Sequence, residues 1–185
     1  MKTLTFFKQY ISKPRMIGAI LPSSKYLAKK MISEIDFNSA KCILEYGPGT
    51  GVFTEKLLAN RNNDTMILLF ENNKEFSEML EEKYKNQPKM YIINDSAEYI
   101  DKYLTHYNIQ EVDYIVSGLP FATLPLDVSS AILEITKRYL KQNGKFITFQ
   151  YTFLKIKFIQ NYFRNVNIKM EVRNIPPAYV LCCGH

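Results

Sequence analysis

The feature of this 185-residue sequence that most constrains its fold is a regular alternation of short apolar runs with amphipathic segments. Apolar runs of strand length lie at 41–46, 65–71, 90–94, 112–117 and 145–151, and a segment with helical spacing follows each of them. Strands separated by helices pair in parallel, and the helices cover both faces of the sheet. Two later runs, around 169–173 and 178–183, are joined by too few residues for a crossover helix and predict an antiparallel hairpin.

Composition places the chain among globular proteins and favours one domain over 1–185. We expect a core at 36–185 and basic amphipathic helices at 1–35 that form a lid or a membrane contact. No apolar run approaches the roughly 20 residues that span a bilayer, and a secretory signal pattern is not found. Three cysteines and two histidines lack metal-type spacing, so we expect no metal, buried free thiols and a reducing cytoplasm. The helix after the fourth strand is expected from Asp127, its cap, to Leu140, with Asn143–Gly144 closing it.

A glycine-rich turn follows the first predicted strand. Gly47, Gly49 and Gly51 alternate between the apolar run and the next helix, so a ligand can approach the backbone closely. Glu45 stands at the end of the strand, where its carboxylate would repel a pyrophosphate but accept hydrogen bonds from a cationic amino-acid group. This combination favours S-adenosylmethionine over NAD or ATP as the ligand.

Two further strand ends carry residues suited to an adenosine. Glu71 ends the second strand, where a carboxylate can accept both ribose hydroxyls. Asp95 follows the third strand and can hold the adenine amino group, or simply cap the helix near Glu98. The predicted cofactor-binding residues are therefore Glu45, Tyr46, Gly47, Gly49, Thr50, Gly51, Glu71, Asn72, Asp95, Ser96, Ala97 and Ser117.

The fourth strand ends in the turn Ser117-Gly118-Leu119-Pro120-Phe121. We expect this turn to line the place where a methyl group is transferred, with its carbonyls orienting an acceptor amine and Phe121 as a wall. All five residues are the predicted catalytic set. The alternative is a tight strand-to-loop turn with no role in the reaction.

Charge is distributed unevenly along the chain, whose formal net charge is +6. Residues 1–33 carry seven basic and no acidic residues, which suggests a polyanionic partner such as an anionic membrane or a nucleic acid. A basic amphipathic helix is predicted near 4–11, and a second helix begins at Ser23 or Ser24. The helix could rest on a membrane or dock on the domain, and a generic solvated surface is the third alternative. The residues expected at the membrane or substrate are Lys8, Tyr10, Arg15, Ser23, Ser24 and Tyr26.

These motifs carry a family resemblance. The segment 45–51, Glu71 and Asp95 resemble the cofactor signature of class I S-adenosylmethionine-dependent methyltransferases. The segments 18–24, 117–121 and 174–178 are similar to those of bacterial phospholipid N-methyltransferases, which methylate phosphatidylethanolamine. The resemblance implies a Rossmann-like, seven-stranded sheet of order 3-2-1-4-5-7-6 with strand 7 antiparallel. It also implies N-methylation of a phospholipid amine by a cytoplasmic protein attached peripherally to the membrane, and we expect a monomer.

The core is also similar to that of the ribosomal RNA adenine dimethyltransferases, so RNA adenine N6-methylation is the alternative function. That family has an Asn-Pro-Pro-Tyr motif or a close variant after strand 4, whose Asn holds the base amine and whose aromatic ring stacks on the flipped base. Here the matching positions are Ser117-Gly118-Leu119-Pro120-Phe121, so the Asn is lost, although Phe121 could still stack on a base. We also expect no helical C-terminal domain after the sheet, and both departures disfavour RNA as the acceptor. The second alternative is a non-catalytic protein that binds S-adenosylmethionine.

Overall fold

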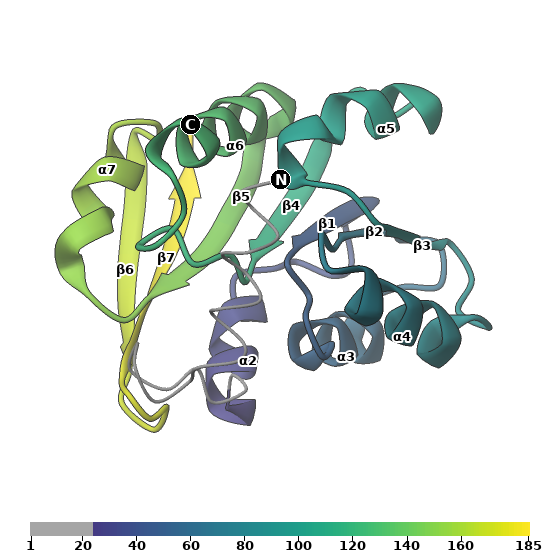
Figure 1. The fold of residues 1–185 in the computed structure, drawn as a ribbon, viewed down its shortest axis with the longest axis horizontal. Coiled ribbons are helices and arrows are strands. Elements are labelled where there is room, and N and C mark those ends of the chain that lie inside the picture. Colours follow the sequence, from purple (N-terminus) through teal and green to yellow (C-terminus); the bar gives the residue numbers. More distant parts are fainter. Residues whose placement is uncertain (1–23) are drawn as a thin grey trace.

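A computed structural model describes residues 24–185, which form a seven-stranded sheet between two layers of helices (Figure 1). The strands are β1 (Cys42–Tyr46), β2 (Met66–Phe70), β3 (Met90–Ile93), β4 (Val112–Ser117), β5 (Leu140–Gln150), β6 (Asn165–Glu171) and β7 (Ala178–Gly184). The helices are α2 (Lys25–Ile32), α3 (Val52–Asn60), α4 (Lys74–Tyr84), α5 (Ile100–His106), α6 (Leu126–Tyr139) and α7 (Ile156–Gln160), with short 3-10 turns η1 (Ala97–Tyr99) and η2 (Phe153–Lys155).

The order of the strands is β3-β2-β1-β4-β5-β7-β6, which confirms the predicted fold class. The first five strands pair in parallel, and β7 runs antiparallel to both β5 and β6. The carboxyl ends of β1 to β6 therefore lie at one edge of the sheet, which we call the carboxyl edge. Ligands of open parallel sheets bind at this edge, where the strand order reverses.

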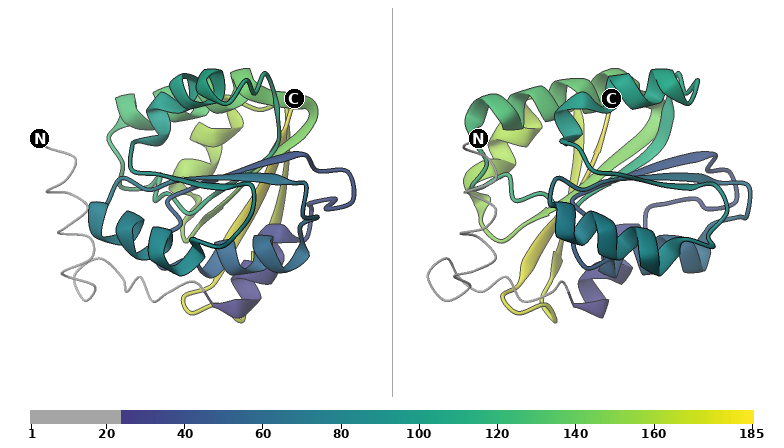
Figure 2. Two further views of the ribbon diagram at one scale, coloured as in Figure 1. Left: turned by 90° about the vertical axis from the view of Figure 1, so that its right-hand side faces the viewer. Right: turned by 45° about the vertical axis from the view of Figure 1, so that its right-hand side comes forward.

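Alternate residues of each strand point into two separate cores, because side chains on a strand alternate between its faces. On one face, Leu44 of β1 packs with residues of α5, α6 and α7. On the other face, Ile43 packs with residues of α2, α3 and α4. The views in Figure 2 show these two helix layers on opposite sides of the sheet. Burial on both faces explains why the strands are almost continuously apolar.

Helix α2 begins where the sequence predicted. Ser24 is its N-cap, and the Ser24 hydroxyl accepts a hydrogen bond from the Leu27 amide at 3.2 Å. The helix expected near 4–11, together with Lys8, Tyr10, Arg15 and Ser23, lies outside the described residues.

The prediction for the end of α6 was wrong. The helix stops at Tyr139, and Leu140 already pairs with Val112 of β4. Gly144 does not adopt a left-handed conformation; its lack of a side chain instead allows close packing, since a Cβ there would lie 2.8 Å from the Asp113 carbonyl oxygen. Lys141 binds Asp113 at 2.5 Å and ties the segment to the neighbouring strand. Asp127 lies in the first turn of α6 and is not its cap.

The three cysteines are free and buried, as predicted. Among the described residues, none of the helices has the length and hydropathy that a membrane span requires.

The core under α6 and α7 allows a test of stability. Phe146 is fully buried and stacks on Phe163 with ring centroids 5.4 Å apart. Phe146→Ala should lower the free energy of unfolding by about 3–5 kcal/mol, the usual cost of truncating a buried aromatic residue. Phe153→Ala, at an exposed position, should cost about 1 kcal/mol or less. Urea denaturation measures both, and equal costs would contradict this account of the core.

Candidate cofactor and methyl-transfer site

The glycine turn after β1 is held by the sheet on both sides. The Gly47 amide donates to the Phe70 carbonyl oxygen at 2.9 Å, and the Gly118 amide donates to the Tyr46 carbonyl oxygen at 2.8 Å. Pairing of β1 with β2 and β4 thus continues into the loops. Gly118 approaches so closely that a Cβ on it would lie 2.7 Å from the Gly47 carbonyl oxygen. The loops after β1 and β4 are therefore in backbone contact.

The turn itself requires glycine. Gly47, Gly49 and Gly51 all have positive φ angles, of 63°, 55° and 86°, which residues with a side chain rarely adopt. Gly51 is the N-cap of α3. No described atom lies within 4 Å of the Cβ position of Gly49, so the space in front of this part of the turn is open. The open space is what a ligand lying against the backbone needs.

Glu45 is fully buried behind the turn. Its Oε2 accepts a hydrogen bond from the Thr54 hydroxyl at 2.8 Å, whereas Oε1 has no hydrogen-bond partner among the described residues. Burial raises the pKa of Glu45 to about 8, the Thr54 hydrogen bond opposes this shift, and the charge of Glu71 adds to it. A buried carboxylate oxygen without a partner is costly unless a cation or donor arrives to meet it. Glu45 is not among the residues that line the pocket described below, so its contact with the ammonium group of an amino-acid ligand stays a prediction.

Glu71 lies at the end of β2 and organises two loops. Its Oε2 accepts from the Gly49 amide at 2.9 Å, and its Oε1 accepts from the Asn73 amide at 2.8 Å. Burial raises the pKa of the Glu71 carboxyl, and these two amides oppose the shift. Each carboxylate oxygen can accept more than one hydrogen bond, so acceptor capacity remains for ribose hydroxyls.

Asp95 lies at the end of β3, and neighbouring groups already engage both of its oxygens. Oδ1 accepts from the Ser96 amide at 2.8 Å, and Oδ2 accepts from the Tyr103 hydroxyl at 2.7 Å. The hydrogen bond to Asp95 raises the pKa of Tyr103 to about 12, so the phenol stays a donor at neutral pH. Ser96, rather than Asp95, caps the 3-10 turn η1.

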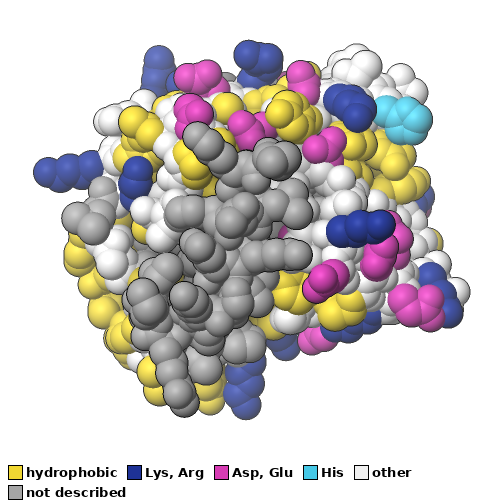
Figure 3. Space-filling view, viewed as in Figure 1, with side chains coloured by type: hydrophobic (Ala, Val, Ile, Leu, Met, Phe, Trp, Pro, Cys, Tyr) yellow, Lys and Arg dark blue, Asp and Glu magenta, His cyan; other side chains and the backbone are white. Residues whose placement is uncertain are grey.

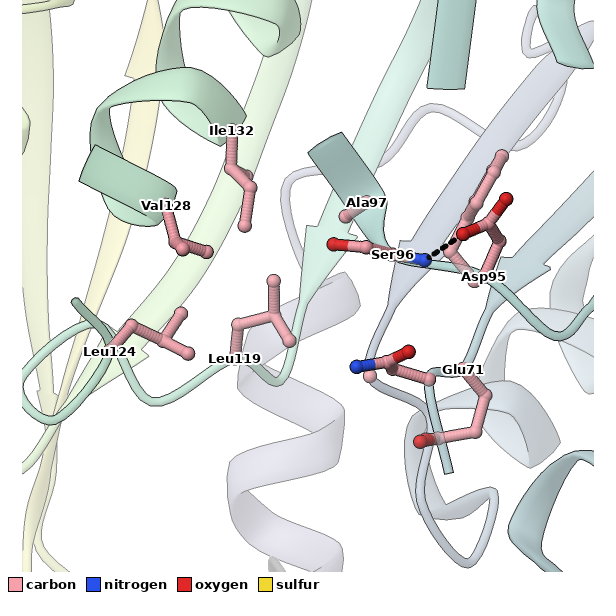
Figure 4. A pocket seen from close by; sticks show the side chains of 11 residues that line it. Glu71, Asp95, Ser96, Ala97, Leu119, Leu124, Val128 and Ile132 are labelled. Atoms are coloured by element: carbon pink, nitrogen blue, oxygen red, sulfur yellow. Dashed lines mark hydrogen bonds between the residues drawn. The ribbon is translucent and has the colours of Figure 1, made fainter. Parts of the chain in front are cut away.

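A pocket brings these strand ends together (Figure 4). Glu71, Asp95 and Ser96 form its polar side, and apolar side chains from α6 and the loop before it face them. The full lining consists of Gly47, Phe70, Glu71, Asn72, Asp95, Ser96, Ala97, Leu119, Leu124, Val128 and Ile132. A pocket with one polar and one apolar wall suits an adenosine, whose ring is apolar on its faces and polar at its edges.

Sequence reasoning missed several of these residues. The sequence predicted Thr54 only as part of a helix. Its polar side chain one turn after the glycine motif was the signal that could have indicated a hydrogen bond to Glu45. Val128 and Ile132 follow a helical spacing of four residues that is equally typical of an ordinary core. Leu124 lies in an irregular loop, where the sequence has no periodic pattern that could have predicted its place in the pocket.

Other predicted residues do not face the pocket. The Tyr46 side chain is buried, with its hydroxyl 3.2 Å from Thr136 Oγ1, and Thr50 is exposed to solvent. Ser117 is buried, and its hydroxyl accepts from the Leu119 amide at 3.2 Å. Phe121 is fully buried and packs edge-on against Phe146 with ring centroids 6.2 Å apart. Of the turn 117–121, only Leu119 lines the pocket.

Solved structures share this fold. Precorrin-6y C5,15-methyltransferase from Geobacter metallireducens superposes with a TM-score of 0.68 at 11% identity, covering 91% of this chain and 90% of that one. TrmN from Thermus thermophilus gives a TM-score of 0.65 at 11% identity, covering 96% and 53%. The sheet order is that of the class I methyltransferase fold, and the family and named relatives that the sequence matches make this chain an S-adenosylmethionine-dependent methyltransferase. More narrowly, the chain belongs to the ribosomal RNA adenine dimethylase family, whose model matches residues 18–153.

Relatives with assigned names differ in their acceptors. An ornithine lipid N-methyltransferase from Singulisphaera acidiphila is 25% identical over 180 residues, covering 96% of this chain and 93% of that protein. Ribosomal RNA small subunit methyltransferase A from Borreliella burgdorferi is 28% identical over 137 residues, covering 71% of this chain. The aligned part of this chain spans about half, 46%, of the latter protein.

The raised pKa of Glu45 predicts a pH dependence of stability. Between the unfolded pKa of 4.5 and the folded pKa of about 8, the folded state keeps a proton that the unfolded state has lost. Rising pH should therefore destabilise the protein across this window, by an amount on the order of a few kcal/mol. Glu45→Gln should flatten this dependence. Urea midpoints between pH 5 and 8 measure it, and identical slopes for both proteins would contradict the assignment.

The open space at Gly49 predicts a loss of cofactor affinity. Gly49→Val should weaken S-adenosylmethionine binding by at least about tenfold, because a branched side chain would occupy the space and disfavour the positive φ angle. Calorimetry gives the affinity, and a urea titration checks the fold. Gly184→Val is the matched control, since a Cβ there meets its nearest atom at 3.6 Å and φ is not positive. Unchanged affinity in Gly49→Val would refute the site.

Proposed function

We propose that this methyltransferase transfers the methyl group of S-adenosylmethionine to the amine of a membrane lipid, such as phosphatidylethanolamine. The observation that carries the choice is the burial of Phe121 against Phe146, in a turn that lacks the Asn of the RNA adenine methyltransferases. A buried ring cannot stack on a flipped base. The match to a lipid N-methyltransferase along almost the whole chain supports the same acceptor.

The cofactor would occupy the pocket at the carboxyl edge. Glu45 would meet its ammonium group, Glu71 its ribose hydroxyls and Asp95 its adenine amino group, with the glycine turn against the amino-acid end. The ligand supplies a sulfonium-bound methyl group, which is already a good electrophile. The protein's contribution is to place the acceptor nitrogen about 3 Å from that methyl group and to exclude water.

The loop after β4 would guide the acceptor. Leu119 lines the pocket, and the Pro120 carbonyl oxygen already accepts from the Thr123 amide at 2.9 Å. A lipid amine is protonated at neutral pH, so it must lose a proton before it attacks. We assign no general base, and water could carry this proton away, because Tyr151, which follows β5, stays a protonated phenol at neutral pH. Burial raises the pKa of its phenol, and a hydrogen bond with Asn174 opposes the shift.

The N-terminal region 1–35 would bring the protein to an anionic membrane. Lys8, Tyr10, Arg15 and Ser23 lie outside the described residues, and the proposal for them rests on the sequence. Within the described part, Tyr26 is partly exposed, and the Arg173 guanidinium lies 4.4 Å from the centre of its ring. Ser24 serves the fold as the cap of α2.

RNA remains the second candidate acceptor because the family and several relatives carry that activity in their names. A radiolabelled methyl-transfer assay should offer phosphatidylethanolamine vesicles, an ornithine lipid and unmodified ribosomal RNA in parallel. Label is expected in the lipid extract and not in RNA, and it should fall at least about tenfold with Gly49→Val. Label in RNA alone would refute the lipid proposal, and S-adenosylmethionine binding without transfer to either would indicate a non-catalytic protein.

A further inference from the structure

The most exposed large apolar side chains of the described residues gather at one edge of the sheet. Ile175 is 74% exposed, Val172 64%, Phe153 62% and Leu126 59%. Each follows the carboxyl end of a strand: Leu126 comes after β4, Phe153 after β5, and the other two form the tip of the β6–β7 hairpin. This is the edge that holds the pocket, which lies at the ends of β1 to β4, whereas the hairpin lies at the β7–β6 end of the sheet.

Part of this surface is continuous. Phe153 packs on Tyr179 of β7 with ring centroids 4.2 Å apart. Tyr179 pairs with Met170 of β6, which is itself partly exposed, and the hairpin tip follows one residue later. We call Phe153, Met170, Val172 and Ile175 the apolar tip surface. In Figure 3, apolar side chains line the lower left margin of the molecule, over this part of the fold.

Basic residues border the tip on the side of α2. Lys25 and Lys29 are exposed on this helix, and Arg173 lies in the tip itself. Lys30 and Arg173 both bind the buried Glu171, at 3.3 and 3.0 Å, so one anion meets two cations there. Glu34 is paired with Lys169. The first turn of α2 and the tip therefore present an excess of positive charge beside exposed apolar groups.

The tip is also held rigidly to α2. The Ser24 amide donates to Asn174 Oδ1 at 3.1 Å, and Asn174 Nδ2 donates to the Pro176 carbonyl oxygen at 2.7 Å. Asn174 is buried although its neighbour Ile175 is highly exposed. The hydrogen bonds therefore fix a conformation in which the apolar side chain points away from the protein.

We propose that the apolar tip surface inserts into the interface of an anionic lipid bilayer and turns the carboxyl edge of the sheet toward the membrane. Exposed aliphatic and aromatic groups beside Lys and Arg are the combination that binds such an interface, because apolar burial and headgroup attraction then act together. The proposal rests on the proposed lipid acceptor. It adds a second contact, distinct from the N-terminal region, that would deliver the lipid amine to the pocket directly from the bilayer.

Because the chain contains no tryptophan, single tryptophan variants report on this surface directly. Ile175→Trp and Phe153→Trp should shift their emission to the blue and be quenched by brominated lipid when the full chain meets phosphatidylethanolamine–phosphatidylglycerol vesicles. Met79→Trp, at a partly exposed position on α4, is the matched control and should not respond. If the vesicles bind the protein but emission at 175 and 153 stays unchanged, the proposal is wrong. It is equally wrong if emission at 175 is already blue-shifted without lipid, since the protein itself would then cover the tip.

A second measurement separates this proposal from the proposed function. Val172→Ser combined with Ile175→Ser should weaken partitioning onto the same vesicles by at least about tenfold, since burying two aliphatic side chains is worth more than the ~1.4 kcal/mol that tenfold represents. Met79→Ser should leave it unchanged. If the double variant partitions as the wild type does, and the wild type methylates vesicle lipid, the proposal that the tip surface inserts into the membrane is wrong, whereas the proposed function stands. Insertion of the tip without methyl transfer to any aminolipid would refute the proposed function and leave the surface intact.

Discussion

The backbone contact between the loops after β1 and β4 is the constraint on which the site depends. The ladder of β1 continues past its end, through Gly47 to β2 and through the Tyr46 carbonyl to Gly118. A side chain on Gly118 would collide with the Gly47 carbonyl oxygen. Because the loops touch without side chains between them, the glycine turn, the end of β2 and the loop after β4 converge on one pocket.

Buried carboxylates are the second determinant of the site. Glu45 is removed from water, and one of its oxygens has no partner among the described residues, which is unfavourable for folding. Such an arrangement is tolerable where a cationic ligand completes it. Glu71, by contrast, already accepts hydrogen bonds from two backbone amides, so it holds the loops together and keeps acceptor capacity for the ribose contact that we propose. The two residues show how a strand end can serve the fold or the ligand, depending on which donors the loops supply.

The side of the pocket at which we propose the acceptor depends on a different set of contacts. Phe121 belongs to the core under α6 and α7, where it meets Phe146, and the loop offers Leu119 to the pocket in its place. The hairpin beyond β6 is tied to α2 through Asn174 and carries exposed apolar groups at the same edge. The pocket and this apolar, basic surface thus belong to the same edge of the sheet, which fits the lipid acceptor that we propose.

The sequence by itself determined the order of strands and helices along the chain and the antiparallel hairpin at the end, and it located the glycine turn and the acidic strand ends on which the cofactor prediction rests. The periodicity of apolar residues and the spacing of glycines are local properties, so they can be read from the sequence. Parallel strands bring their carboxyl ends to one edge of the sheet however the side chains pack. Only the tertiary structure decided which side chains face the pocket. The side chains of Phe121 and Tyr46 are buried in the core, and the Thr54 hydroxyl donates to Glu45. Val128 and Ile132 form the apolar wall of the pocket. The sequence does not show these contacts, because they depend on how α3 and α6 pack against the sheet. The sequence also could not predict why glycine is needed at position 144. A Cβ there would collide with the Asp113 carbonyl oxygen on β4, 31 residues away in sequence.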